Sequence, residues 1–184
     1  MINPDVFLIH FSKGNTTFGD AQILHKFAEN RSLKVEIGTA YGIGAMILSI
    51  HGGTVYTIDN HTFYSDYKKP KIKHKIIKDY LDFFTSGRIK SIIQDSVKAS
   101  ESFDDETIEL LYIDGGHSYK QVKADFEAWF PKVKTDAVII FHDVCFDCPG
   151  VNRFYKRYLK KLKTIRELVQ KSEFETSIKV FVKG

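Results

Sequence analysis

The chain has 184 residues, of which 43% are hydrophobic and 14% aromatic, and its formal net charge is +4. This length supports one buried core and is short for two ordinary domains, so we expect a single domain over residues 1–184. The composition excludes a disordered chain, and no apolar run reaches the roughly 18 residues that would predict a membrane span. The first residues lack a basic segment followed by a long apolar core, so no secretory signal is expected and a cytoplasmic location is predicted.

Apolar runs alternate with helical patterns along the chain. We expect residues 1–31 to form a helical flank, with a helix at about 17–30 that places Phe18, Ile23, Leu24 and Phe27 roughly on one face. Strands are expected at 33–37, 54–58, 89–93, 108–113 and 137–141, and near the end at about 164–170 and 176–183. Helices are expected at 43–51, about 64–85, 95 or 96 to 100, 118–130 and 149–162. This alternation predicts βαβ units and a mostly parallel sheet that is covered on both faces.

The first strand leads into a glycine-rich turn, VEIGTAYGIG at residues 35–44. Glycines allow a backbone to turn through positive φ and to approach a ligand closely. A loop that binds pyrophosphate relies on backbone N–H groups and has no use for a carboxylate beside it. Because Glu36 precedes the glycines, the pattern favours a ligand that carries an ammonium group or sugar hydroxyls.

Every predicted parallel strand ends in or just before an acidic residue: Glu36, Asp59, Asp95, Asp114 and the pair His142-Asp143. Ligands of such sheets bind outside the carboxyl ends of the strands. Acids crowded at one edge destabilise a fold unless a cation or a polyhydroxyl ligand offsets them. Asp59 stands where nucleotide-binding folds hold a ribose, with a turn cap as the alternative, and Asp95-Ser96 can meet an adenine edge, cap a helix, or do both.

A second group comprises Asp114, His117, His142 and Asp143. Two carboxylates and an imidazole at adjacent strand ends predict a divalent-metal site. Oxygen-rich ligation favours magnesium or manganese, and His142 shifts the preference toward manganese or iron. His117, one turn beyond Asp114, is a candidate general base near neutral pH. The structural alternatives are a His117 that bonds local backbone and a buried His142 held by a carbonyl group.

Two features remain without an assigned role. The basic runs Lys68 to Lys78 and Lys156 to Lys163 fit a nucleic-acid groove, an acidic substrate, or two solvated helix faces. The C-x-x-C pair of Cys145 and Cys148 is a weak zinc signal, and we expect reduced, incidental thiols.

The segments VEIGTAYGIGA, TIDN, QDS, YIDGGHSYKQVKADFEAW and VIIFHDV together resemble the class I S-adenosylmethionine-dependent methyltransferases. The D-G-G-H-S-Y-x-x-V-x-x-D segment followed by F-H-D is closest to a branch of small-molecule and sugar O-methyltransferases, which is similar to the metal-dependent catechol O-methyltransferase group. The resemblance implies an α/β, three-layer Rossmann-like sandwich with a mostly parallel seven-stranded sheet and an antiparallel C-terminal strand.

The resemblance also implies roles for individual residues. The residues expected to contact S-adenosylmethionine are Glu36, Gly38, Thr39, Ala40, Tyr41, Gly42, Asp59, Asn60, Asp95, Ser96 and Asp114. The metal ligands would be Asp114, His142 and Asp143, and His117 would be the catalytic base. His142 departs from the family pattern, because relatives usually carry a carboxylate at that position.

Expected partners are a small-molecule or sugar hydroxyl, with nucleic acid and a homodimer left open. The alternatives are an RNA methyltransferase, a non-catalytic cofactor-binding module, and a nicotinamide-dependent oxidoreductase. The oxidoreductase would favour G-x-G-x-x-G over the G-x-x-x-G-x-G found here.

Overall fold

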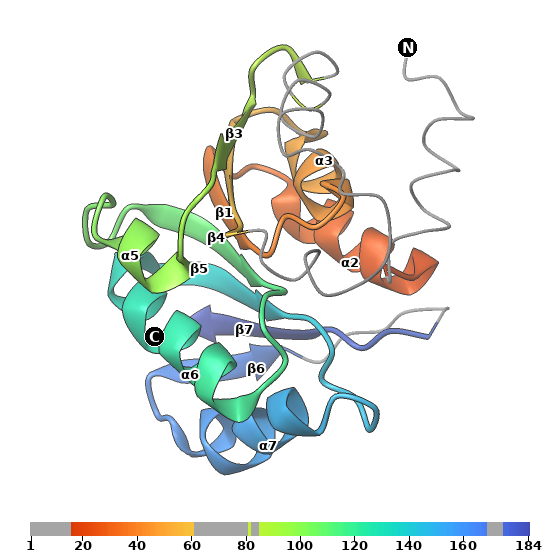
Figure 1. Ribbon diagram of the computed structural model, residues 1–184, viewed down its shortest axis with the longest axis vertical. Coiled ribbons are helices and arrows are strands. Elements are labelled where there is room, and N and C mark those ends of the chain that lie inside the picture. The colour runs from red at the N-terminus through yellow and green to blue at the C-terminus, as the bar shows by residue number, and fades with distance from the viewer. Residues whose placement is uncertain (1–15, 61–80, 82–84, 169–174) are drawn as a thin grey trace.

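The computed structural model describes residues 16–60, 81, 85–168 and 175–184. Its centre is a seven-stranded sheet with strand order β3-β2-β1-β4-β5-β7-β6 (Figure 1). The strands are β1 Leu33–Ile37, β2 Thr54–Ile58, β3 Ile89–Ile92, β4 Ile108–Ile113, β5 Val133–Phe141, β6 Ile165–Leu168 and β7 Lys179–Lys183. Neighbours pair in parallel from β3 to β5, whereas β7 pairs antiparallel with both β5 and β6. The predicted α/β class, the strand number and the antiparallel C-terminal strand are confirmed.

Helices cover both faces of the sheet, which gives the three layers (Figure 1). The helices are α2 Phe18–Ala28, α3 Ile43–Ser49, α5 Ser96–Ser100, α6 Tyr119–Trp129 and α7 Pro149–Arg157, with short 3-10 turns at Phe130–Lys132 and Leu159–Lys161. Because side chains alternate along a strand, β4 sends Leu110 and Tyr112 into the core under α2 and α3, and Leu111 and Ile113 into the core under α6 and α7. Both faces of the central strands are therefore buried, as their continuous apolar sequence predicts.

Several element boundaries differ from those expected. Strand β5 begins at Val133, four residues before the expected 137, and its pairing with β4 shifts register between Ile108 and Leu110. Helix α7 ends at Arg157 and gives way to a 3-10 turn instead of continuing to 162. Phe18 is 58% exposed, so its expected place on the buried face of α2 is wrong. Most of the helix expected at about 64–85, and the basic run from Lys68, lie outside the described residues.

Helix starts follow the capping residues in the sequence. Thr17 and Asp20 form a capping box at α2, in which the Thr17 hydroxyl accepts from the Asp20 N–H and the Asp20 carboxylate accepts from the Thr17 N–H. Ser118 caps α6 and Asp95 caps α5, as expected. Within the described part of the chain, no helix is long and apolar enough to cross a membrane.

Candidate active site

The predicted strand-end residues Asp59, Asp114 and His142 lie along one edge because the sheet ladder continues one residue beyond the strand ends. Gly38 N–H donates to the Ile58 carbonyl at 2.8 Å, Asp59 N–H to Ile92 at 3.1 Å, Asp114 N–H to Ile37 at 2.8 Å and His142 N–H to Ile113 at 3.0 Å. These bonds align the first residues of the four loops along one edge. The edge is the carboxyl end of the parallel strands, where ligands of such sheets bind.

The glycine-rich turn is packed tightly against this edge. Gly38 has φ +96°, and a Cβ there would lie 2.1 Å from the Asp114 carbonyl oxygen, so only glycine fits. Gly42 has φ +81° and Ala40 φ +43°. The Ala40 N–H donates to the Asp59 carboxylate at 3.0 Å, which joins the glycine turn to the end of β2. The turn thus keeps a left-handed backbone beside the carboxylate expected to meet a ribose.

Glu36 is turned into the protein. It is 1% exposed, accepts a hydrogen bond from the Thr57 hydroxyl, and lies against Gly44, where a Cβ would be 2.1 Å from Glu36 Oε1. Burial raises the pKa of Glu36 well above its ordinary value, and the nearby charge of Asp114 acts in the same direction. Thr39 is also buried, with its hydroxyl 2.7 Å from that of Thr57. Because Glu36 is buried, it can influence a ligand only indirectly, by positioning neighbouring residues such as Thr57.

The Asp95-Ser96 pair serves the packing of the following helices. Asp95 Oδ1 accepts from the Lys98 N–H at 3.2 Å, and Ser96 Oγ accepts from Trp129 Nε1 at 2.9 Å. Ser96 also bonds the carboxyl of Asp125, which is 7% exposed. Burial raises the pKa of Asp125 to about 6, against the opposing effect of the Ser96 hydrogen bond. Among the other predicted contact residues, Tyr41 is half-buried and Asn60 is exposed.

His142 lies at the centre of the acidic cluster and is 4% exposed. Its Nδ1 is 3.2 Å from Asp114 Oδ1 and 3.2 Å from Asp143 Oδ1, and its Nε2 is 3.2 Å from Asp20 Oδ2. Burial opposes protonation of His142, but the facing carboxylates, with Asp114 foremost, outweigh it and raise the pKa to about 12. Tyr112 orients the cluster further, because its hydroxyl donates to Asp114 Oδ2 at 3.0 Å.

Asp20 is a site residue that the sequence did not indicate. It lies 122 positions before His142 and is fully buried. Its Oδ1 accepts from the Thr176 hydroxyl at 2.7 Å and from the Ser177 N–H at 3.2 Å. Burial opposes ionisation of Asp20, but the bonds to His142, Thr176 and Thr17 lower the pKa to about 2. In the sequence, Asp20 carries only the capping-box signal Thr17-x-x-Asp20, which does not point to His142.

These side chains fit a divalent cation. Asp114, His142 and Asp143 each offer a ligand atom, and the three atoms lie within 4.8 Å of one another. Among the described residues, His142 Nδ1 is the buried side-chain polar atom that lacks a hydrogen-bond partner, and it faces both carboxylates. Asp20 lies 3.2 Å from Nε2 and can accept its proton. A metal would therefore bind at Nδ1 and displace the proton that the facing carboxylates favour there. A carboxylate behind a metal-ligating histidine is a recurring arrangement in metal sites.

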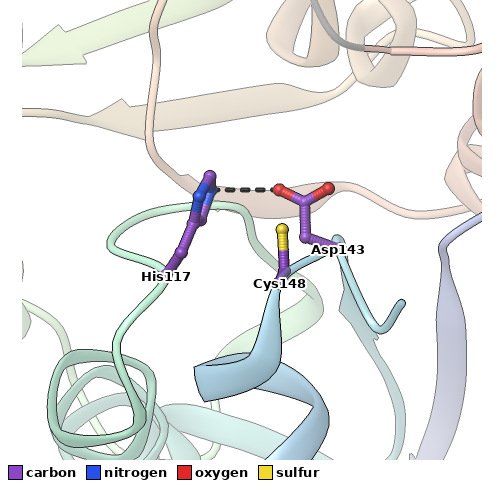
Figure 2. A group of neighbouring side chains, drawn as sticks. All are labelled: His117, Asp143 and Cys148. Carbon is purple, nitrogen blue, oxygen red and sulfur yellow. Dashed lines mark ion pairs between the residues drawn. The ribbon is translucent and has the colours of Figure 1, made fainter. Parts of the chain in front are cut away.

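His117 contacts the same acidic cluster from the β4–α6 loop. Its Nε2 is 3.0 Å from Asp143 Oδ2, and Figure 2 shows this pair beside the thiol of Cys148. The hydrogen bond to Asp143 raises the pKa of His117, against the effect of burial. Asp143 thus directs one carboxylate oxygen to each histidine. It does so from a left-handed backbone, φ +57°, which is uncommon for a residue with a side chain and concentrates at functional sites.

A family model described as a methyltransferase domain matches residues 35–144, which covers most of the site above. The curated protein y4gI of Sinorhizobium fredii is 29% identical over 121 residues, which are 59% of this chain and 13% of that protein. The chain therefore spans a small part of this relative's length.

Solved structures share the fold. A methyltransferase from Geobacter sulfurreducens is similar over 100% of this chain and 90% of its own, with a TM-score of 0.71 and 13% identity. The O-methyltransferase TomG from Streptomyces achromogenes, solved in complex with S-adenosylmethionine, is similar over 91% of this chain and 80% of its own, with a TM-score of 0.65 and 13% identity.

The family model spans the glycine turn, Asp59, Asp95-Ser96, Asp114 and His142-Asp143 in one continuous match. It is a methyltransferase family, so the nicotinamide-dependent alternative is not supported. Taken with the seven-stranded sheet and its order, these findings show that the chain belongs to the class I S-adenosylmethionine-dependent methyltransferases.

Proposed function

We propose that the protein transfers a methyl group from S-adenosylmethionine to a hydroxyl of a small molecule or sugar, with a divalent cation at Asp114, His142 and Asp143. The observation that carries this proposal is the convergence of these three side chains beside the glycine turn, with a buried His142 Nδ1 facing both carboxylates. The class of TomG, an O-methyltransferase, supports the choice of a hydroxyl acceptor.

The cofactor's adenosine and methionine would lie along the strand ends. Asp59 is the proposed partner of the ribose hydroxyls, since its carboxylate lies beside the glycine turn through its bond with the Ala40 N–H. Asp95 is the proposed neighbour of the adenine, while Ser96 holds the underlying packing through Trp129. S-adenosylmethionine, when bound, supplies an electrophilic methyl on its sulfonium sulfur. The chain contributes mainly by holding the acceptor oxygen in line with that methyl, which avoids the entropic cost of a chance encounter.

The proposed cation site orients the acceptor. Magnesium or manganese, bound by Asp114, His142 and Asp143, would lower the pKa of an acceptor hydroxyl. Asp20 would keep the Nε2 proton of His142 in place, so that the ring presents Nδ1 to the ion. Tyr112 would fix the other oxygen of Asp114 by its hydrogen bond.

His117 is the proposed general base. It is the exposed histidine of the cluster, with 49% of its side chain accessible, so an acceptor can reach its imidazole. Asp143 Oδ2 accepts the proton on Nε2 and thereby sets the ring orientation, which leaves Nδ1 free to take a proton. The order along the edge is then cofactor turn, metal ligands, base.

An RNA acceptor is the second candidate. The side chains of Arg153, Lys156, Arg157, Lys160 and Lys161 on and after α7 are exposed, as a backbone-binding surface would require. Charge alone also describes a solvated helix face, so the small-molecule acceptor is preferred.

One experiment tests the proposal. Release of S-adenosylhomocysteine would be measured with the full chain, S-adenosylmethionine and a panel of vicinal diols and catechols, with and without EDTA, and in parallel with total RNA. We expect turnover on a hydroxyl compound that EDTA abolishes and that added manganese or magnesium restores. Turnover that survives excess EDTA would reject the metal, and turnover on RNA alone would replace the proposed acceptor.

A further inference from the structure

A second cluster of metal-binding side chains lies on the outer side of Asp143. His117, Asp143 and Cys148 each offer a ligand atom, and the three atoms lie within 4.8 Å of one another. Figure 2 shows the sulfur of Cys148 directed toward the gap between the His117 ring and the Asp143 carboxylate. The three residues come from three segments: the β4–α6 loop, the end of β5 and the start of α7.

The backbone holds these segments together without help from a ligand. A Cβ at Gly150 would lie 2.2 Å from the His117 carbonyl oxygen, so the first turn of α7 rests directly on the loop that carries His117. The Tyr119 and Phe154 rings pack edge to face at 6.0 Å between α6 and α7. The Asp143 N–H donates to Ser177 Oγ at 3.2 Å, and this hydrogen bond holds the backbone of Asp143 in place. A preformed arrangement is what separates a binding site from three side chains that happen to meet.

We propose that His117, Asp143 and Cys148 form a binding site for a soft divalent cation, with zinc as the expected ion. Zinc takes imidazole nitrogen, thiolate sulfur and carboxylate oxygen as ligands, and with three protein ligands it keeps a fourth position open. A thiolate selects zinc over magnesium or calcium, which prefer oxygen ligands. This site therefore differs in chemistry from the group of Asp114, His142 and Asp143, although the two share one carboxylate.

The thiol of Cys148 is protonated before a metal arrives. Burial raises its pKa to about 12, and the negative field of Asp143 and the contact with Cys145 act in the same direction. Zinc binding forms the metal–sulfur bond and releases the thiol proton, together with any proton on His117 Nε2, to solvent.

An ion in this site would stop the proposed reaction, and this consequence rests on the proposed function. The ion would bind Nε2 of His117 and so replace the hydrogen bond to Asp143 that orients the ring for its role as base. It would also bind Asp143, which would then no longer be available to the adjacent cation site. The same residues would then support methyl transfer with magnesium or manganese and be inhibited by zinc.

The binding test uses cobalt as a spectroscopic probe for zinc. Titration of the metal-free full chain with Co²⁺ is expected to give a thiolate-to-cobalt charge-transfer band that saturates at one equivalent, and Zn²⁺ is expected to abolish it. Cys148→Ser should remove the band and weaken zinc binding by more than about tenfold. Loss of a residue that merely hydrogen-bonds to a metal ligand typically lowers metal affinity by about tenfold or more, and loss of a ligand itself should cost at least as much. Serine is a favourable residue at a helix start, so this variant is expected to fold.

Cys145→Ser is the matched control, since it removes the neighbouring thiol and should retain the band. A wild-type protein without the band, or a band that is lost in Cys145→Ser instead of Cys148→Ser, would overturn the site.

In the methyl-transfer assay, zinc should inhibit the wild-type protein at least tenfold and leave Cys148→Ser active. Equal inhibition of both would overturn the regulatory role. If the wild-type protein shows no methyl transfer without zinc, the proposed function fails, whereas the cobalt spectrum still decides the binding site.

Discussion

Asp125 provides a quantitative test of the packing beneath the cofactor edge. Its carboxyl is 7% exposed, bonds Ser96, and faces the charge of Asp95. A Cβ at Gly115 would lie 3.3 Å from Asp125 Oδ2, so this carboxyl lies beneath the β4–α6 loop as well as the β3–α5 loop. Replacing it by the isosteric amide, Asp125→Asn, retains the shape and the hydrogen-bonding oxygen and removes the titration.

The magnitude follows from the pKa. The carboxyl titrates at about 6 in the folded protein against an ordinary 3.8. The folded state therefore binds more protons than the unfolded chain between these values, and stability falls as pH rises through this window. At about 1.4 kcal/mol per pH unit, the ionised carboxylate costs about 3 kcal/mol above pH 6.

Denaturant unfolding at several pH values checks this expectation. Asp125→Asn should be more stable than the wild-type protein by about 3 kcal/mol at pH 7.5, and the gap should close by about pH 4. The control is the same pH series on Asp104→Asn, which makes the same substitution at an exposed position. A difference between Asp125→Asn and the wild-type protein that is constant across pH would refute the reasoning.

Three further predictions concern the site. His117→Ala should lower turnover by about 100-fold or more while leaving S-adenosylmethionine affinity nearly unchanged. The control, His51→Ala, replaces an exposed histidine in the α3–β2 turn and should change neither turnover nor affinity. Equal turnover in the two variants would show that His117 is not the base. Asp20→Asn should weaken manganese binding, followed by electron paramagnetic resonance, by about 10- to 100-fold, because a neutral amide polarises the buried histidine less than a carboxylate does; unchanged affinity would contradict the positioning role. Gly38→Ala should destabilise the fold by more than about 2 kcal/mol in thermal unfolding, because backbone strain adds to the clash with the Asp114 carbonyl. Gly52→Ala is the control: it is also at positive φ but has no atom within 4 Å of the added Cβ, so it should cost only about 1 kcal/mol. Similar losses in the two variants would show that the clash at Gly38 is relieved.

The order of strands and helices and the edge at which acids gather could be predicted from the sequence. Alternating apolar runs determine which segments are strands, and parallel pairing brings their carboxyl ends to one edge. Asp114, His142 and Asp143 were therefore expected to meet, and they do. The ladder bonds beyond the strand ends are the physical reason, because they carry the register of the sheet into the first loop residues.

Tertiary contacts between distant segments could not be predicted. Asp20 contacts His142 across 122 positions, and only the packing of α2 against the sheet brings them together. Asp125 appears in the motif that resembles the family, yet its burial beneath two loops depends on where α6 settles. The direction of Glu36 into the protein follows from the close approach of Gly44, which spacing along the chain does not reveal. Some element boundaries also differ from those expected, because the apolar pattern does not show where a helix gives way to a 3-10 turn, as it does after α7.

Cofactor binding tests the central claim most directly. Calorimetric titration of the full chain with S-adenosylmethionine and, separately, with NAD⁺ should give saturable one-to-one binding of the first and none of the second. Asp59→Ala should weaken binding of S-adenosylmethionine by at least about tenfold, because the ribose hydroxyls would lose the charged carboxylate that accepts their hydrogen bonds. Absence of S-adenosylmethionine binding, or binding that is indifferent to Asp59, would contradict the assignment of this edge as the methyl donor's site.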